Sequence, residues 1–252
     1  MQEIDLTKSK DVIGAYNSID FSYERKTYTD YGTQYCFNVL DGKIVAGYNI
    51  QLACFRHLRD LQRQGDEDFP YVYSIEAFNR FLKFLSLVPN VDDLSQKLEP
   101  MDWQYFIFAQ LFAWFDLDDV PRFSNIIISI ARSQGKTMIA GICLNFSYLI
   151  EIIGQSNQDF LVSSLNFDQT MKLYTYVKSM MARIIENEPF KSLADETQVQ
   201  LYSREIKSLV DANTIHTISF ESGKFDGKHF KLAVADEVGE LRTDEGISKI
   251  TS

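Results

Sequence analysis

The sequence contains few cysteines and histidines, and neither residue type is clustered. Its three cysteines, Cys36, Cys54 and Cys143, are an odd number and stand far apart along the chain. No CxxC pair or Cys/His cluster occurs, which argues against a structural zinc site and against a disulfide framework. The sequence therefore predicts free thiols in a reducing compartment, and surface or structural roles for the three histidines.

Long apolar runs and an N-terminal targeting pattern are missing as well. No stretch approaches the roughly 18 uncharged apolar residues that would span a bilayer. Residues 1–11 do not combine a basic start with an apolar segment. These absences predict a soluble protein that is not secreted and has no membrane partner.

Positive charge is in deficit, because 35 acidic residues face 25 basic ones and the formal net charge is -10. This balance argues against a general affinity for nucleic acid, although a local basic patch or a multi-subunit channel would still permit DNA binding. The rest of the composition is that of a globular protein, with 45% hydrophobic and 24% charged residues in a chain of 252. That length allows one large domain, or a domain with a smaller appendage.

The N-terminal part is predicted to be helical after an irregular start. Residues 1–38 show no clean hydrophobic period and are expected to form an arm or irregular segment. Apolar residues then recur every three or four positions, which predicts helices over residues 42–64, 75–87 and 102–115. Their phenylalanines are expected to pack in a core.

The pattern changes at residue 125, where strands begin to alternate with helices. Residues 125–130 form a short apolar run rich in isoleucine, which is typical of a buried parallel strand. Further strands are expected at 160–164, 199–210, 214–220 and 231–235, and helices at 137–153 and 167–186. This alternation predicts an α/β fold with a mainly parallel central sheet flanked by helices.

A phosphate-binding loop is predicted between the first of these strands and the helix that follows it. The loop consists of Arg132, Ser133, Gln134, Gly135, Lys136 and Thr137. It matches the second half of the general P-loop pattern G-x-x-x-x-G-K-[ST], but Ile130 stands where the first glycine is expected.

Each part of this loop suits a nucleoside triphosphate for a physical reason. Gly135 would let the backbone approach the phosphates, while the N–H groups of residues 133–137 and the positive end of the new helix would face them. Lys136 would neutralise the β- and γ-phosphates, and the Thr137 hydroxyl would bind Mg²⁺. The alternative is that a Gly-Lys-Thr tripeptide occurs at this junction by chance.

An acidic pair follows the last strong apolar run of the chain. Residues 231–235 predict a strand, and Asp236 and Glu237 come directly after it. Open α/β sheets bind ligands at the carboxyl ends of their strands, so Asp236 would hold Mg²⁺ beside the phosphate loop. Glu237 would orient the attacking water and accept its proton. The alternative is a pair of solvated acids in a turn.

Together these residues resemble the large subunit of tailed-phage terminases, the DNA-packaging motors. The resemblance extends over nearly the whole chain, from the helix at residues 53–61 through the segment at 98–104 and onward. In that family the P-loop lacks its first glycine and carries an early Arg or Lys that contacts the γ-phosphate, a feature that Arg132 matches. A family segment containing proline and tryptophan ends in a glutamine that contacts adenine, which implies this role for Gln104.

The resemblance implies a P-loop NTPase fold of the ASCE type behind an N-terminal helical subdomain. Residues 1–97 would form the arm and helical subdomain, and residues 98–252 the ATPase core. ATP and Mg²⁺ would be the cofactors, and Glu237, Arg132 and Lys136 the catalytic residues. The implied partners are double-stranded DNA, the portal protein, the small terminase subunit and further copies in a ring, in the cytoplasm of the infected bacterial host.

Two further features are implied by the same family. A basic residue from a neighbouring subunit completes each site, and Lys224, Lys228 and Arg204 are candidates here, although a plain surface charge is the favoured interpretation of each. Residues 160–164, followed by Gln169, resemble a strand and loop that lie near the nucleotide.

The chain departs from the family after the acidic pair. Family members usually carry a C-terminal nuclease domain and a coupling motif beyond the acidic strand, and neither is evident before Ser252. We therefore expect a truncated ATPase domain or the product of a split gene. Two other functions remain open at this point: another P-loop translocase or helicase-like ATPase, and a non-catalytic nucleotide-binding module.

Overall fold

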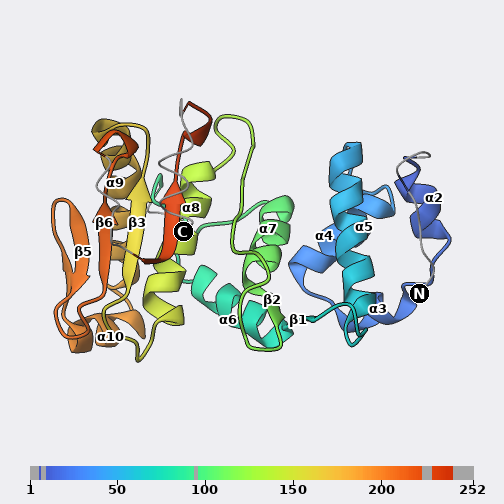
Figure 1. Cartoon of the computed structure of the whole chain (residues 1–252), viewed down its shortest axis with the longest axis horizontal. Coiled ribbons are helices and arrows are strands. Elements are labelled where there is room, and N and C mark those ends of the chain that lie inside the picture. Colours follow the sequence, from blue (N-terminus) through green and yellow to red (C-terminus); the bar gives the residue numbers. More distant parts are fainter. Residues whose placement is uncertain (1–5, 7–9, 94–95, 223–228, 241–252) are drawn as a thin grey trace. The chain divides into compact units, whose positions relative to one another are not determined.

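The computed structural model describes residue 6 and residues 10–93, 96–222 and 229–240 of the chain. The chain divides into two compact units (Figure 1), each of which is described by itself below. The helical unit comprises Met1–Leu82 and Glu99–Ile126, and the sheet unit comprises Lys83–Leu98 and Ile127–Ser252. Within the part of the chain that is described, no helix has the length and apolar character needed to cross a bilayer.

The helical unit is built from short helices and one two-stranded sheet. Its elements are α2 (Val12–Asn17), α3 (Ser22–Thr27), α4 (Tyr31–Leu40), α5 (Tyr48–Arg63), β1 (Tyr71–Tyr73), α7 (Asp102–Phe112) and β2 (Trp114–Asp116). Helix α6 (Ile75–Leu85) begins in this unit and ends in the other. Strands β1 and β2 pair antiparallel. The helices predicted at 42–64, 75–87 and 102–115 are confirmed as α5, α6 and α7, with α5 beginning at Tyr48.

The prediction of an irregular segment before residue 38 is wrong, because α2, α3 and most of α4 lie there. Side-chain caps start two of these helices: Asp11 accepts a hydrogen bond from the Gly14 N–H at 2.8 Å, and Asp30 accepts one from the Thr33 N–H at 2.9 Å. Such caps satisfy N–H groups that the first helical turn leaves unpaired. Helices this short show little hydrophobic periodicity, so the capping residues are the better sequence signal of where they begin.

Close packing between helices forms the core of this unit. Helix α4 packs against both α5 and α7. Gly32 permits the approach to α7, because a Cβ at this position would lie 2.5 Å from the Cβ of Ala109. The predicted phenylalanine core is confirmed, since Phe78 and Phe81 of α6 are fully buried.

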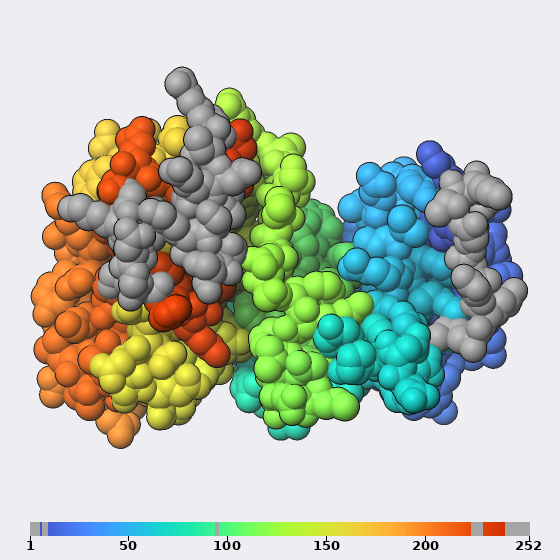
Figure 2. Space-filling model, in the orientation of Figure 1, coloured from blue at the N-terminus to red at the C-terminus, as the bar shows by residue number. Residues whose placement is uncertain are grey.

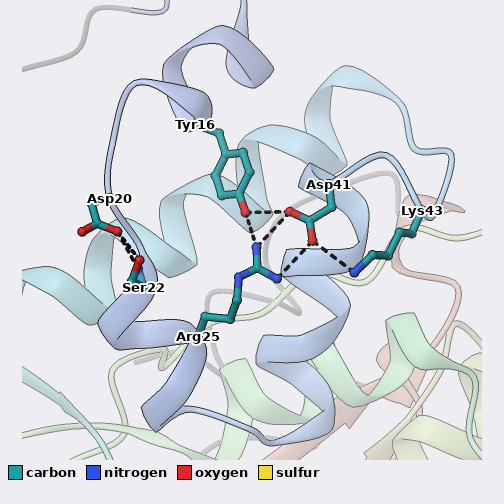
Figure 3. A network of polar contacts seen from close by, with 6 residues as sticks. All are labelled: Tyr16, Asp20, Ser22, Arg25, Asp41 and Lys43. Carbon is teal, nitrogen blue, oxygen red and sulfur yellow. Dashed lines mark hydrogen bonds and ion pairs between the residues drawn. The ribbon is translucent and has the colours of Figure 1, made fainter.

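A polar network joins α2, α3 and the end of α4 (Figure 3). The Arg25 guanidinium donates to both carboxylate oxygens of Asp41 at 3.0 and 2.9 Å, and it lies 4.1 Å from the ring centroid of Phe37. The Tyr16 hydroxyl donates to Asp41 at 2.8 Å, and Lys43 forms an ion pair with the same carboxylate at 3.2 Å. Burial, reinforced by the bond to Asp41, raises the pKa of Tyr16 to about 12, so its hydroxyl remains a donor at neutral pH.

His57 occupies the interior of the helical unit as a neutral side chain. Its Nε2 lies 3.0 Å from the Thr33 hydroxyl, and its Nδ1 lies 3.0 Å from the Gln110 amide nitrogen. Burial lowers the pKa of His57 to about 3, because the charged imidazolium would lose its hydration. The structural role predicted for this histidine fits these contacts.

Acidification should therefore destabilise the helical unit through His57. The folded-state pKa of about 3 lies below the ordinary value of 6.5, so the stabilisation is complete above pH 6.5. It is lost as the pH falls below that value, because only the unfolded chain then takes up the proton. Between about pH 7 and about pH 5 the loss should be roughly 2 kcal/mol. Urea unfolding at both pH values measures it.

Two histidine variants make this prediction specific. His57→Gln retains polar atoms for Thr33 and Gln110 but cannot titrate, so its unfolding free energy should fall less with acid than that of the wild type. His229 is exposed, and His229→Gln should retain the wild-type pH dependence. An unchanged pH dependence in His57→Gln would show that this histidine does not carry the effect.

The sheet unit contains the predicted alternation of strands and helices. Its elements are α8 (Lys136–Phe146), the π-helix η1 (Ser147–Glu151), β3 (Asp159–Ser163), α9 (Phe167–Ile184), α10 (Phe190–Thr197), β4 (Val199–Leu201), β5 (Glu205–Ser208), β6 (Thr214–Thr217), the 3-10 helix η2 (Phe220–Ser222), β7 (Phe230–Ala235) and the 3-10 helix η3 (Val238–Glu240). The helices predicted at 137–153 and 167–186 and the strands predicted at 160–164, 214–220 and 231–235 are confirmed, with small shifts of their ends.

The sheet has the strand order β4-β5-β6-β3-β7 and is mixed rather than mainly parallel. Strand β3 pairs parallel with β6 and β7, whereas β4 pairs antiparallel with β5, and β5 with β6. The single strand predicted at 199–210 is in fact the hairpin of β4 and β5, which turns at Ser203 and Arg204. The antiparallel strands β4 and β5 thus extend one side of the parallel strands β6, β3 and β7.

The strand predicted at residues 125–130 is not formed, which corrects the sequence-based expectation. Ile127 is 89% exposed and Ile126 is 47% exposed, and the light-green segment before α8 lies at the surface in Figure 2. A strand needs a partner for its backbone N–H and C=O groups, and none of the strands in the described ranges pairs with these residues. Composition alone could not reveal that the pairing partner is missing.

Helix α8 begins beside one edge of the sheet in this unit. Helix α8 packs against β7 and α9, and α9 packs against β3 and β6. The central strand β3 is fully buried at Phe160, Leu161 and Val162. Figure 1 shows that α8 begins at the edge of the sheet where β3 and β7 end. The segments that follow β3 and β7 therefore lie at the same edge as the N-terminus of α8, which is the positive end of its helix dipole.

Candidate nucleotide-binding site

The phosphate loop enters α8 through two residues of left-handed backbone. Ser133 has φ 60° and Gly135, the N-cap of α8, has φ 80°. The Ile139 N–H donates to the Gly135 carbonyl at 2.9 Å and closes the first helical turn. Because glycine has no side chain, the N-cap position supplies no capping oxygen to the N–H groups at the start of the helix. Those groups and the helix dipole suit an anion such as phosphate.

The side chains expected to contact the phosphates cluster around this turn. Lys136 and Thr137 are the first two residues of α8 and are partly exposed, whereas Arg132 is exposed at the tip of the loop. The helix predicted to follow the loop is thus present, although the preceding strand is not.

The acidic pair lies directly beyond β7, where hydrogen bonds to β3 hold it. The Asp236 N–H donates to the Ser163 carbonyl at 3.0 Å, and the Ser164 hydroxyl donates to the Asp236 carbonyl at 3.2 Å. The Glu237 N–H donates to Oδ1 of Asp236 at 2.9 Å. Asp236 is half-buried, while Glu237 is exposed and has a left-handed φ of 56°.

The phosphate loop and the acidic pair belong to the same edge of the sheet unit. Helix α8 packs against β7, and its first residue lies at the edge where β7 ends (Figure 1). Within the described ranges, no group of three or more His, Cys, Asp and Glu side chains could hold a metal ion. A cation here would accordingly depend on Asp236, the Thr137 hydroxyl and the oxygens of the nucleotide itself, which are the hard ligands that Mg²⁺ prefers.

Gln104 belongs to the helical unit, where it caps α7. Its Oε1 accepts a hydrogen bond from the Met101 N–H at 2.9 Å, and the residue is only 2% exposed. In this cap the side chain at the third helical position accepts a hydrogen bond from the N–H of the N-cap residue, which explains why a glutamine suits that position. The contact with adenine implied by the family resemblance remains an expectation.

Of the three candidate trans-acting residues, the structure describes Arg204. Lys224 and Lys228 lie outside the described residues. Arg204 lies in the exposed turn between β4 and β5, and its guanidinium carbon is 5.0 Å from the ring centroid of Phe167 at the start of α9. Since β5 begins where the parallel strand β6 ends, Arg204 shares the sheet edge of the acidic pair.

Comparison with known proteins identifies the family. The sequence model of the family described as "Terminase large subunit, ATPase domain" matches residues 102–252. The chain belongs to this family. A search of curated proteins found no match.

One solved structure supports the same fold for the terminase ATPase domain. The large terminase of bacteriophage HK97 aligns with a TM-score of 0.52 at 19% sequence identity. The alignment covers 69% of this chain and 34% of that protein, so the chain spans about a third of its relative's length. Membership of the family confirms the predicted terminase ATPase domain, and it implies ATP as the nucleotide and the ASCE P-loop fold.

Proposed function

We propose that this terminase ATPase domain hydrolyses Mg²⁺-ATP at the sheet edge shared by α8 and β7, and that hydrolysis drives double-stranded DNA into a procapsid. The observation that carries the proposal is the convergence of the uncapped start of α8 and the acidic pair at one edge. Motor action would take place in the cytoplasm of the infected host, with the portal protein, the small terminase subunit and further copies of the chain in a ring as partners.

Each side chain of the site has a proposed role. Lys136 and the loop N–H groups bind the phosphates, and Arg132 contacts the γ-phosphate, where its planar guanidinium can donate two parallel hydrogen bonds. Thr137 and Asp236 would hold Mg²⁺, which when bound neutralises phosphate charge. Glu237 orients the attacking water and accepts its proton.

Further contacts proposed for the nucleotide site rest on the family resemblance. Gln104 is proposed to recognise adenine, and Ser133 and Gln134 contribute backbone N–H groups to the loop. A basic residue from a neighbouring subunit, one of Lys224, Lys228 and Arg204, is proposed to complete each site in the ring.

Calorimetric titration with ATP tests the site directly. Mg²⁺ should strengthen ATP binding, because Thr137 and Asp236 would hold the cation and the bound cation would neutralise phosphate charge. Chelation of Mg²⁺ should weaken the binding and stop turnover, and re-addition should restore both. An ATP affinity that is the same with and without Mg²⁺ would contradict the proposed metal site.

The same preparation distinguishes packaging from strand separation. Double-stranded DNA should accelerate ATP turnover, and the effect should weaken with added salt because phosphate contacts release counterions. A forked duplex should not be unwound. Strand separation of that fork would favour a helicase-like function instead.

A further inference from the structure

The peptide group between Asp236 and Glu237 is held at both of its ends. Its carbonyl, which belongs to Asp236, accepts the 3.2 Å hydrogen bond from the Ser164 hydroxyl. Its N–H, which belongs to Glu237, donates to Oδ1 of Asp236 at 2.9 Å. The orientation of this one peptide plane therefore depends on a serine side chain beyond the end of β3.

This restraint supports an unusual backbone conformation at Glu237. The left-handed φ of 56° costs a residue other than glycine about 1–2 kcal/mol. Such a conformation persists only where neighbouring groups over-determine it. If the peptide plane turned over, Glu237 would relax toward an extended backbone and its carboxylate would point in another direction.

Ser164 is itself fixed from three sides. It is 1% exposed, and its N–H donates to the Thr170 hydroxyl at 3.0 Å. That hydroxyl donates in turn to the Asn166 carbonyl at 2.9 Å, inside the first turn of α9. The Ser164 carbonyl accepts the Phe220 N–H at 3.0 Å. The serine thus connects α9 and the segment after β6 to the acidic pair.

The adjacent serine provides a natural contrast. Ser163 is equally buried, at 0% exposure, yet among the described residues its hydroxyl has no hydrogen-bond partner. Its backbone carbonyl, and not its hydroxyl, accepts the hydrogen bond from Asp236. Two neighbouring serines of the same size and burial therefore differ in whether their hydroxyl contacts the acidic pair.

We propose that Ser164 is a positioning residue for ATP hydrolysis: its hydroxyl sets the Asp236 to Glu237 peptide and thereby directs the Glu237 carboxylate. The proposal rests on the function given above, in which Glu237 activates the attacking water. Ser164 does not itself touch the nucleotide in this scheme.

Steady-state kinetics of three serine variants test this role. Ser164→Ala should lower kcat by about 10-fold while KM for ATP stays within about 2-fold, because the phosphate loop is unchanged and only the base is misdirected. Ser164→Thr keeps a hydroxyl and should recover most of kcat. Ser163→Ala, the matched control, should keep the wild-type kcat, and thermal unfolding of each variant checks that it folds.

A second measurement does not depend on turnover. Equilibrium binding of Mg²⁺-ATP should stay within about 2-fold of the wild type in both Ser164→Ala and Ser163→Ala, because the phosphate loop is unchanged in each variant. ATP affinity without Mg²⁺ should be equal in both variants and the wild type.

The outcomes separate this role from the proposed function. A wild-type chain with neither turnover nor Mg²⁺-dependent binding would remove the proposed function and the positioning role with it. Wild-type activity together with an unaltered Ser164→Ala would remove the positioning role alone. Equal losses of kcat and metal-free ATP affinity in Ser164→Ala would show general structural damage and would also overturn the role.

Discussion

Replacing Lys136 by alanine should abolish ATP hydrolysis and weaken ATP binding by about 100-fold. Lys136 is the first residue of α8, where its ammonium group adds full positive charge to the partial charge of the helix end. Hydrogen bonds to charged groups contribute about 1.5–3 kcal/mol, and each 1.4 kcal/mol changes affinity tenfold. Calorimetry with Mg²⁺-ATP measures the affinity, and phosphate release measures the turnover.

A lysine on the exposed face of α9 provides the control for this variant. Lys172→Ala removes the same charge from a solvated helix surface and should leave affinity and turnover unchanged. If Lys136→Ala bound Mg²⁺-ATP as tightly as the wild type, this loop would not be the phosphate site.

Glu237→Gln should separate binding from turnover. The amide keeps the size of the side chain but cannot accept a proton, and general-base catalysis contributes about 10²- to 10⁴-fold. We expect kcat to fall by about 1000-fold, whereas ATP affinity stays within about 2-fold because the phosphate loop is intact. Single-turnover hydrolysis and equilibrium ATP binding, measured on the same preparation, give the two quantities.

Glu221→Gln offers a matched acid-to-amide change, since Glu221 is an exposed acid of η2 after β6. It should retain the wild-type kcat. Wild-type turnover in Glu237→Gln would assign the base to another residue, and a parallel loss of ATP affinity would assign Glu237 to binding rather than to chemistry.

The phosphate loop and the acidic pair could be predicted because each is a contiguous motif. Gly135, Lys136 and Thr137 lie in one turn of backbone, and Asp236 and Glu237 follow a strand that its own residues predict. Local sequence therefore predicted helix α8 and strand β7, which carry the candidate residues.

Features that depend on distant pairing were missed. The isoleucine-rich run at 125–130 has strand composition, but composition does not supply a neighbouring strand. The single strand predicted at 199–210 is a hairpin because its polar centre at Ser203 and Arg204 turns the chain. The segment of Ser164 was expected near the nucleotide, but its bond to Asp236 could not be predicted because it arises from the parallel register of β3 and β7.

The short N-terminal helices were missed for another reason. Hydrophobic period needs several turns to become visible, whereas α2 and α3 have six residues each. Helix α2 begins at the Asp11 cap, and the network around Asp41 in Figure 3 joins α2 to α3.

The exposed isoleucines before α8 also affect how copies of this chain behave in solution. Residues 125–130 contain four isoleucines and no charge, and a backbone outside any sheet leaves them free to pair with the same segment of another copy. The net charge of -10 opposes that encounter by mutual repulsion. Salt screens the repulsion but not the apolar attraction, so the colloidal stability of the domain decreases with rising ionic strength.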